Sequence, residues 1–226
     1  MTRRTNAGLA GFTFLFYIAA GVAAMVLFGR ATGAEGTAAK LASIAEHATD
    51  MRVAILLTLL TCFAALVLAV TLYGITRDQD PDLAMLALTC RVGEGVLNAI
   101  FMLTKLELLW VATAAGANAP DPTAAHALGA FLLTAPRVWN VTIGATFFAV
   151  GSTLFSWLLL RGRMVPVPLA WLGVVASVLL VVGLPLQLAG AIGSPVTDFM
   201  WIPMLMFEVP LGLWLLIKGV AARPTR

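Results

Sequence analysis

Charged residues are scarce in this sequence. Of its 226 residues only 11% are charged and 61% are hydrophobic, and the mean hydropathy is +0.97. Soluble domains carry about 25% charged residues, so a soluble fold could not hide this much apolar surface. The net charge of +3 comes from Lys and Arg at segment ends, without a basic patch interleaved with aromatics, and therefore indicates membrane orientation and no nucleic-acid partner.

Cysteine and histidine are equally rare. The two cysteines, Cys62 and Cys90, both lie in apolar segments, which excludes a disulfide framework and a CxxC site and predicts packing roles. Neither histidine lies in an apolar segment, so haem between helices is excluded and no cofactor is expected. His47 and His126, with Glu46 and Asp50, are only weak candidates for a metal site.

Long hydrophobic runs, in contrast, fill most of the chain. A spanning helix needs about 20 apolar residues, and by that measure the sequence contains six spans within one integral-membrane domain, residues 1–226. We place them at about 9–29, 53–75, 83–113, 138–160, 167–191 and 199–220. The expected fold is an all-α polytopic membrane helix bundle.

The polar connections add detail to this bundle. In the first loop, Leu41, Ile44, Ala48 and Met51 recur at helical spacing and predict a short interfacial helix. In the third loop, residues 124–133 predict a second one before Pro136. Pro81 and Asp82 are placed to begin the third span, and Gly144 and Gly151 share one face of the fourth, as expected for close helix packing.

The distribution of basic residues predicts the orientation. Cytoplasmic loops are enriched in Lys and Arg, and this rule favours both termini in the cytoplasm of a bacterial cell, with the chain in the inner membrane. In this arrangement the cytoplasmic side holds Arg3, Arg4, Arg77, Arg161, Arg163, Lys218, Arg223 and Arg226, against Arg30, Lys40, Arg52 and Arg137 outside.

Three segments carry a family resemblance. They are RVGEGVLNAIFMLTKL at Arg91–Leu106, TIGATFFAVGSTLFSWLLLRGRMVPVPLAWLGVV at Thr142–Val175, and FEVPLGLWLLIKGV at Phe207–Val220. With these, the chain resembles the bacterial integral-membrane proteins grouped as domain-of-unknown-function family 4386. The resemblance implies a multi-spanning bacterial membrane protein and implies no activity.

One stretch of the third span is polar. Arg91, Glu94, Asn98 and Lys105 are spaced to share one side of a helix, and at 1.5 Å per residue Arg91 lies at about the same depth as Glu208 of the sixth span. Buried charges are normally paired, so we predict that Glu94 and Glu208 flank Arg91 with Asn98 beside them. Two acids against one base require a proton on one glutamate or a further cation. Lys105 is expected to reach the membrane boundary.

The function remains open at this point. We expect a non-enzymatic structural, sensory or partner-binding module, because no HExxH, GxSxG or Ser/His constellation lies in a span. The alternative is a small proton-linked transporter or ligand-binding membrane protein that uses Arg91, Glu94 and Glu208. With six spans and no internal repeat, a transport pathway would require a homodimer. An intramembrane enzyme acting on lipid or quinone has the least support.

Overall fold

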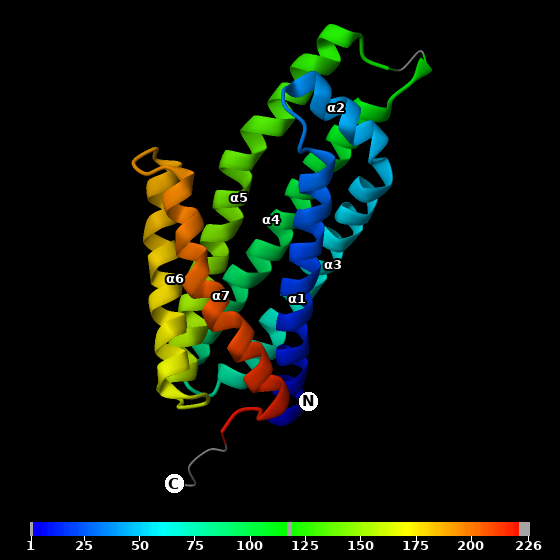
Figure 1. The fold of residues 1–226 in the computed structure, drawn as a ribbon. Helices are drawn as coiled ribbons and strands as arrows, with labels where there is room; N and C mark the ends of the chain where they lie inside the picture. Colours follow the sequence, from blue (N-terminus) through cyan, green and yellow to red (C-terminus); the bar gives the residue numbers. More distant parts are fainter. Residues whose placement is uncertain (1, 117–118, 222–226) are drawn as a thin grey trace.

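The structure, a computed structural model, describes residues 2–116 and 119–221, apart from the side chains of residues 135–141. This part of the chain is all-helical (Figure 1). All helices except α2 are long and apolar enough to cross a membrane, so the protein is a polytopic membrane helix bundle, as predicted. The helices are α1 (Arg3–Ala31), α2 (Thr37–Glu46), α3 (Ala48–Thr76), α4 (Pro81–Thr113), α5 (Pro122–Arg161), α6 (Val167–Leu188) and α7 (Ser194–Ile217).

The start of α4 follows from local chemistry. The side chain of Asp80 accepts a hydrogen bond from the backbone N–H of Leu83 at 3.1 Å, and Pro81 occupies the first helical position. A proline costs nothing there, because the first N–H groups of a helix lack intrahelical partners. The predicted start of the third span is thereby confirmed.

The six long helices form a closed ring in chain order. Each helix packs against the next, and α7 returns to pack against α1 (Figure 1). Among the described residues, the backbone of α7 approaches only α6 and α1 closely. Side chains that point inward from the six helices therefore share one interior, and both described ends of the chain lie at the same end of the bundle.

Glycines permit the closest approaches in this ring. A Cβ on Gly11 of α1 would lie 2.4 Å from the backbone nitrogen of Leu216 and 2.5 Å from the carbonyl oxygen of Gly212, so α1 and α7 touch backbone to backbone. Gly144 and Gly151 of α5 face Asn98 and Arg91 of α4, which confirms the packing role predicted for them.

The end of the bundle opposite the termini projects beyond α6 and α7. Here α5, with 40 residues, is about 60 Å long, whereas α6, with 22 residues, is about 33 Å long. The predicted short helix of the first loop is present as α2, and its apolar face packs on protein: Ile44 is fully buried in a second hydrophobic cluster with Met51 and Leu108.

The second short helix, expected at residues 124–133, is not a separate element. The helix α5 runs unbroken from Pro122 to Arg161. An internal proline removes one backbone hydrogen bond, and a long membrane helix tolerates that loss where neighbouring groups compensate for it. Of the basic residues used to predict the orientation, the side chain of Arg137 and all of Arg223 and Arg226 lie outside the described part.

The backbone contact at Gly11 generates a stability prediction. The variant Gly11→Ala should lower the free energy of unfolding in detergent by about 3 kcal/mol, because the added methyl group has only backbone atoms to displace. The control is Gly21→Ala on the same helix, where nothing lies within 4 Å of the added Cβ. Equal thermal unfolding midpoints for the two variants would show that α1 and α7 are not in backbone contact.

Candidate functional site

A buried ion pair lies in the interior of the ring. The Nη1 atom of Arg91 is 2.9 Å from the Oε2 atom of Glu94, and the two side chains are 1% and 2% exposed. Both residues belong to α4 and are three positions apart, so consecutive turns of one helix place them together. A charge pair at this burial is shielded from water, and its interaction is far stronger than that of a surface pair.

The guanidinium of Arg91 is held by α5. Its Cζ atom lies 4.6 Å from the centroid of the Phe148 ring, and that ring in turn lies 5.5 Å from the ring of Trp201 on α7. A Cβ on Gly151 would come within 2.8 Å of the Arg91 side chain, so this glycine provides the space for its aliphatic part. Cation–π contact and close packing together fix the position of the charge.

The carboxylate of Glu94 has a second partner, which the sequence analysis did not assign to the site. The hydroxyl of Tyr17 on α1 donates a hydrogen bond to its Oε1 atom at 3.0 Å. The hydroxyl of a tyrosine in an apolar helix usually needs a hydrogen-bond partner, and the chain has only two tyrosines. The position of Tyr17 in an apolar segment was therefore the sequence signal that could have identified it as part of the site. We call Tyr17, Arg91, Glu94 and Glu208 the polar centre.

Glu208 of α7 completes the polar centre without forming an ion pair. It is 6% exposed, and its charge interacts with those of Arg91 and Glu94. No oxygen of Glu208 comes within 4.0 Å of an Arg91 nitrogen, and its Oε1 atom has no hydrogen-bond partner among the described residues. The expected pairing is therefore present for Glu94, while Glu208 acts on Arg91 at longer range.

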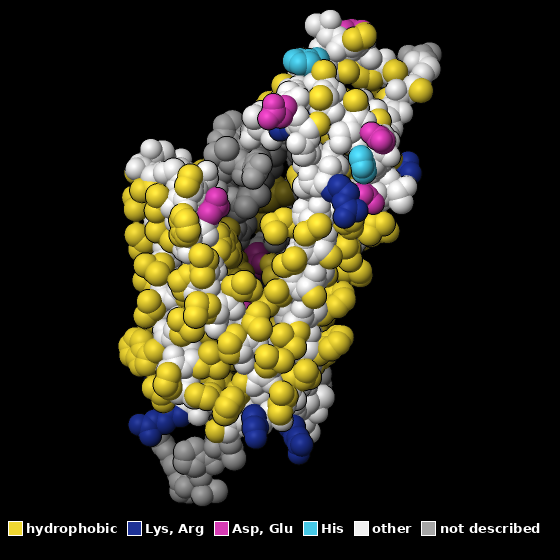
Figure 2. All heavy atoms as spheres, in the orientation of Figure 1, with side chains coloured by type: hydrophobic (Ala, Val, Ile, Leu, Met, Phe, Trp, Pro, Cys, Tyr) yellow, Lys and Arg dark blue, Asp and Glu magenta, His cyan; other side chains and the backbone are white. Residues whose placement is uncertain are grey.

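The polar centre keeps unused hydrogen-bonding capacity. Within the described part of the chain, Nε and Nη2 of Arg91 are buried and donate to no acceptor. Arg91 also lines a cavity of about 10 Å³, together with Ser152, Ser156 and Phe207, which is roughly the space of one water molecule. Figure 2 shows the surface hollowed between α1 and α7, with acidic surface visible inside the hollow.

The other polar residues of α4 point to different neighbours. Asn98 is half-buried against α5, where its Oδ1 atom would lie 3.0 Å from a Cβ on Gly144. Lys105 turns toward α3: its Nζ atom donates to the hydroxyl of Thr58 at 2.9 Å and lies 5.4 Å from the ring centroid of Phe28, near the end of α1, so its position at the membrane boundary stays a prediction. These partners place the half-buried Lys105 side chain against α3 and α1.

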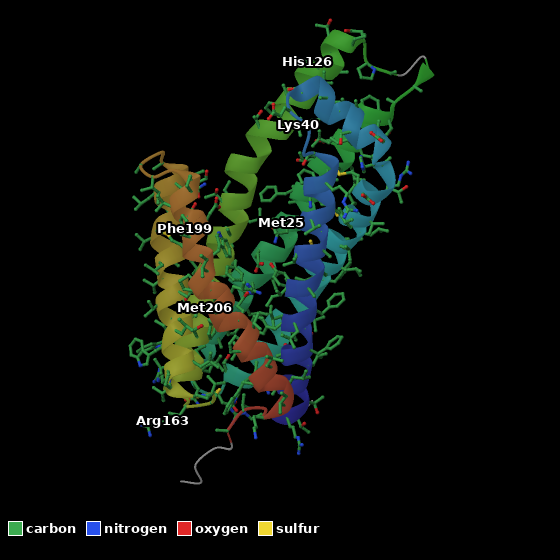
Figure 3. The ribbon with its side chains drawn as sticks, viewed as in Figure 1. Met25, Lys40, His126, Arg163, Phe199 and Met206 are labelled. Atoms are coloured by element: carbon green, nitrogen blue, oxygen red, sulfur yellow. The ribbon has the colours of Figure 1, made fainter. Side chains whose placement is uncertain are left out.

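The remaining candidate residues are separate from the polar centre. No group of three or more His, Cys, Asp and Glu among the described residues could hold a metal ion, so the weak candidates His47 and His126 are not brought into a site. A ring nitrogen of His47 lies 3.0 Å from the carbonyl oxygen of Ser43, and His126 lies near the far end of the molecule (Figure 3). Cys62 and Cys90 are buried free thiols.

Comparison with known proteins yields one family. The sequence model of the family described as Domain of unknown function (DUF4386) matches residues 9–219. The chain belongs to the DUF4386 family. No match was found among curated proteins or among solved structures. As a DUF4386 member with six apolar helices, the protein is a multi-pass membrane protein of a family without an assigned function.

The hydrogen bond from Tyr17 should contribute measurably to stability. The variant Tyr17→Phe should lower the free energy of unfolding by about 1.5–3 kcal/mol, because the Glu94 carboxylate loses its uncharged donor in a buried position. The variant Tyr73→Phe is the matched control, since the Tyr73 hydroxyl has no hydrogen bond within the described residues and should change stability by less than about 0.5 kcal/mol. Equal denaturation curves for both variants would exclude the assigned hydrogen bond.

Proposed function

We propose that this protein is a non-enzymatic sensory module of the membrane that responds to proton binding at the polar centre. The observation that carries the proposal is the presence of two buried carboxylates, Glu94 and Glu208, around the single guanidinium of Arg91. With both acids ionised, the polar centre bears a net charge of one negative unit in a low-dielectric interior. One proton on either acid removes that excess charge.

Among the described residues, no cation besides Arg91 offsets the charge on Glu208. On α4, Arg91 and Glu94 interact with it, and on α1 Tyr17 does so through its phenol. The helix α6, which is the other element packed against α7, contains no ionisable side chain. Burial disfavours a charge on Glu208, Arg91 offsets part of this cost and Glu94 adds to it, so the ionised state of Glu208 weakens the attachment of α7 to the ring and the protonated state strengthens it.

The helix α7 is built to respond to such a change. It contains two internal prolines, Pro203 and Pro210, on either side of Glu208, and each removes a backbone hydrogen bond from the helix. Its backbone packs closely only against α6 and α1 among the described residues. We assign a shift of α7 as the structural response to proton binding, because α7 makes the fewest backbone contacts of the six spanning helices among the described residues.

A second candidate function is a small carrier or ligand-binding protein. It is favoured by the hollow between α1 and α7, which gives access to acidic surface (Figure 2). It is also favoured by the Nε and Nη2 atoms of Arg91, which have no partner within the described residues and suit a small polar or anionic solute. In this function the same residues bind solute together with a proton, and a homodimer supplies the pathway.

We also propose that the chain lies in a bacterial inner membrane with both termini in the cytoplasm. Basic side chains that include Arg77, Arg161, Arg163 and Lys218 belong to the helix ends on the side of the termini. The described basic residues at the opposite end are fewer, namely Arg30, Lys40 and Arg52. This asymmetry supports the cytoplasmic assignment of the termini.

The proposal predicts a pH-dependent attachment of α7. In the wild-type protein, amide hydrogen exchange of residues 194–217, corrected for the intrinsic pH effect, should be about tenfold faster at about pH 9 than at about pH 5. The variant Glu208→Gln should keep the slow exchange at every pH, because the amide cannot ionise. The variant Asp198→Asn is the matched control: it removes an exposed acid from the same helix and should behave as wild type.

A second variant separates sensing from structure. Glu94→Gln should also abolish the pH dependence of exchange, because the charge of Glu208 alone then balances that of Arg91. Unlike Glu208→Gln, it should lower thermal stability, because it weakens the contacts of residue 94 with Arg91 and Tyr17. Wild-type pH dependence in Glu208→Gln would assign the polar centre a static structural role. If the wild-type protein takes up solute in reconstituted vesicles and Glu208→Gln does not, the result would favour the carrier function.

A further inference from the structure

A second pocket lies at the end of the bundle that holds the termini. It has a volume of about 320 Å³ and is formed by the turn between α5 and α6 and by the end of α7. The backbone N–H of Ala221 donates to the carbonyl oxygen of Met164 at 3.0 Å and ties the two segments together. Volumes of about 300–1,000 Å³ are typical of small-ligand sites.

Two basic side chains and no acidic one line this pocket among the residues that the structure describes. Arg163 and Lys218 are exposed, and neither forms an ion pair with a carboxylate among the described residues. The nearby Arg161 differs, since its Nη1 atom lies 3.3 Å from the Oδ2 atom of Asp80. The pocket therefore concentrates uncompensated positive charge and suits an anion.

The position of the pocket identifies the kind of anion. Three spanning helices end around it: α5 ends at Arg161, α6 begins at Val167 and α7 ends at Ile217. Figure 3 shows Arg163 at this end of the bundle, beyond the helices. Trp214 also lines the pocket, one turn inside the end of α7, where an indole suits the boundary between headgroups and acyl chains. Phospholipid headgroups occupy this level of a membrane.

We propose that this pocket binds the phosphate of an anionic phospholipid. The guanidinium of Arg163 binds phosphate oxygens through paired N–H groups, and the ammonium of Lys218 contributes a second cation from the opposite wall. The Trp214 ring packs against the glycerol and upper acyl chain. Basic pockets between membrane helices are known lipid-headgroup sites, and the assignment is independent of the function proposed for the polar centre.

The test measures lipid retention on the purified full-length chain. Native mass spectrometry with phosphatidylglycerol and with phosphatidylcholine should show preferential retention of phosphatidylglycerol. In the double variant Arg163→Gln/Lys218→Gln, affinity for phosphatidylglycerol should fall about thirtyfold, with unchanged retention of phosphatidylcholine. The control Arg77→Gln removes an exposed basic residue from the same end of the bundle and should retain the lipid as wild type does. The charge-conserving pair Arg163→Lys/Lys218→Arg should keep most of the affinity.

Three results would overturn the assignment. Equal losses in Arg77→Gln and in the double variant would mean that the lipid responds to overall surface charge. Unchanged phosphatidylglycerol retention in the double variant would exclude the pocket. Displacement of the lipid by inorganic phosphate at equal concentration would identify a site for free phosphate, because a lipid site gains affinity from the glycerol and acyl contacts that the free ion lacks.

Discussion

The ion pair between Arg91 and Glu94 constrains the whole bundle. Lipid offers neither charge a partner, and a charged side chain at the centre of a membrane helix costs about 2.5–3.5 kcal/mol on insertion scales. The protein meets this cost with partners from separate helices: the Tyr17 hydroxyl comes from α1, and the Phe148 ring and the gap at Gly151 come from α5. The three helices α1, α4 and α5 are therefore held in one arrangement by a single buried pair.

The same pair does not account for every polar atom around it. A pair with a purely structural role is most favourable when each remaining donor and acceptor is satisfied, because unpaired buried groups carry their full desolvation cost. Here Arg91 keeps donors without acceptors, and Glu208 keeps an acceptor without a donor, within the described residues. A proton, a water molecule or a small solute completes such an arrangement, and that is why we assign the polar centre a binding role.

Much of the fold could be predicted from hydropathy, because bilayer thickness sets the length of each span. The α2 helix and the start of α4 also followed from local patterns around Ile44 and Pro81. The order of helices in the ring could not be derived in this way, since lipid-facing and protein-facing sides of a membrane helix are both apolar. For the same reason, the turn of Lys105 toward Thr58 and the approach of Tyr17 to Glu94 depend on neighbours that no periodicity identifies.

The two proposed sites lie on the same helix, and this has a thermodynamic consequence. Glu208 of α7 and Lys218, which caps the C-terminal end of this helix, are ten positions apart, or about 15 Å along the helix axis. A lipid held at Lys218 favours whichever position of α7 keeps the end of the helix near the turn at Arg163. If protonation of Glu208 favours that same position, each ligand must raise the affinity for the other by an equal factor, since binding free energies are linked reciprocally. If the two favour different positions, the coupling changes sign and anionic lipid drives the proton off.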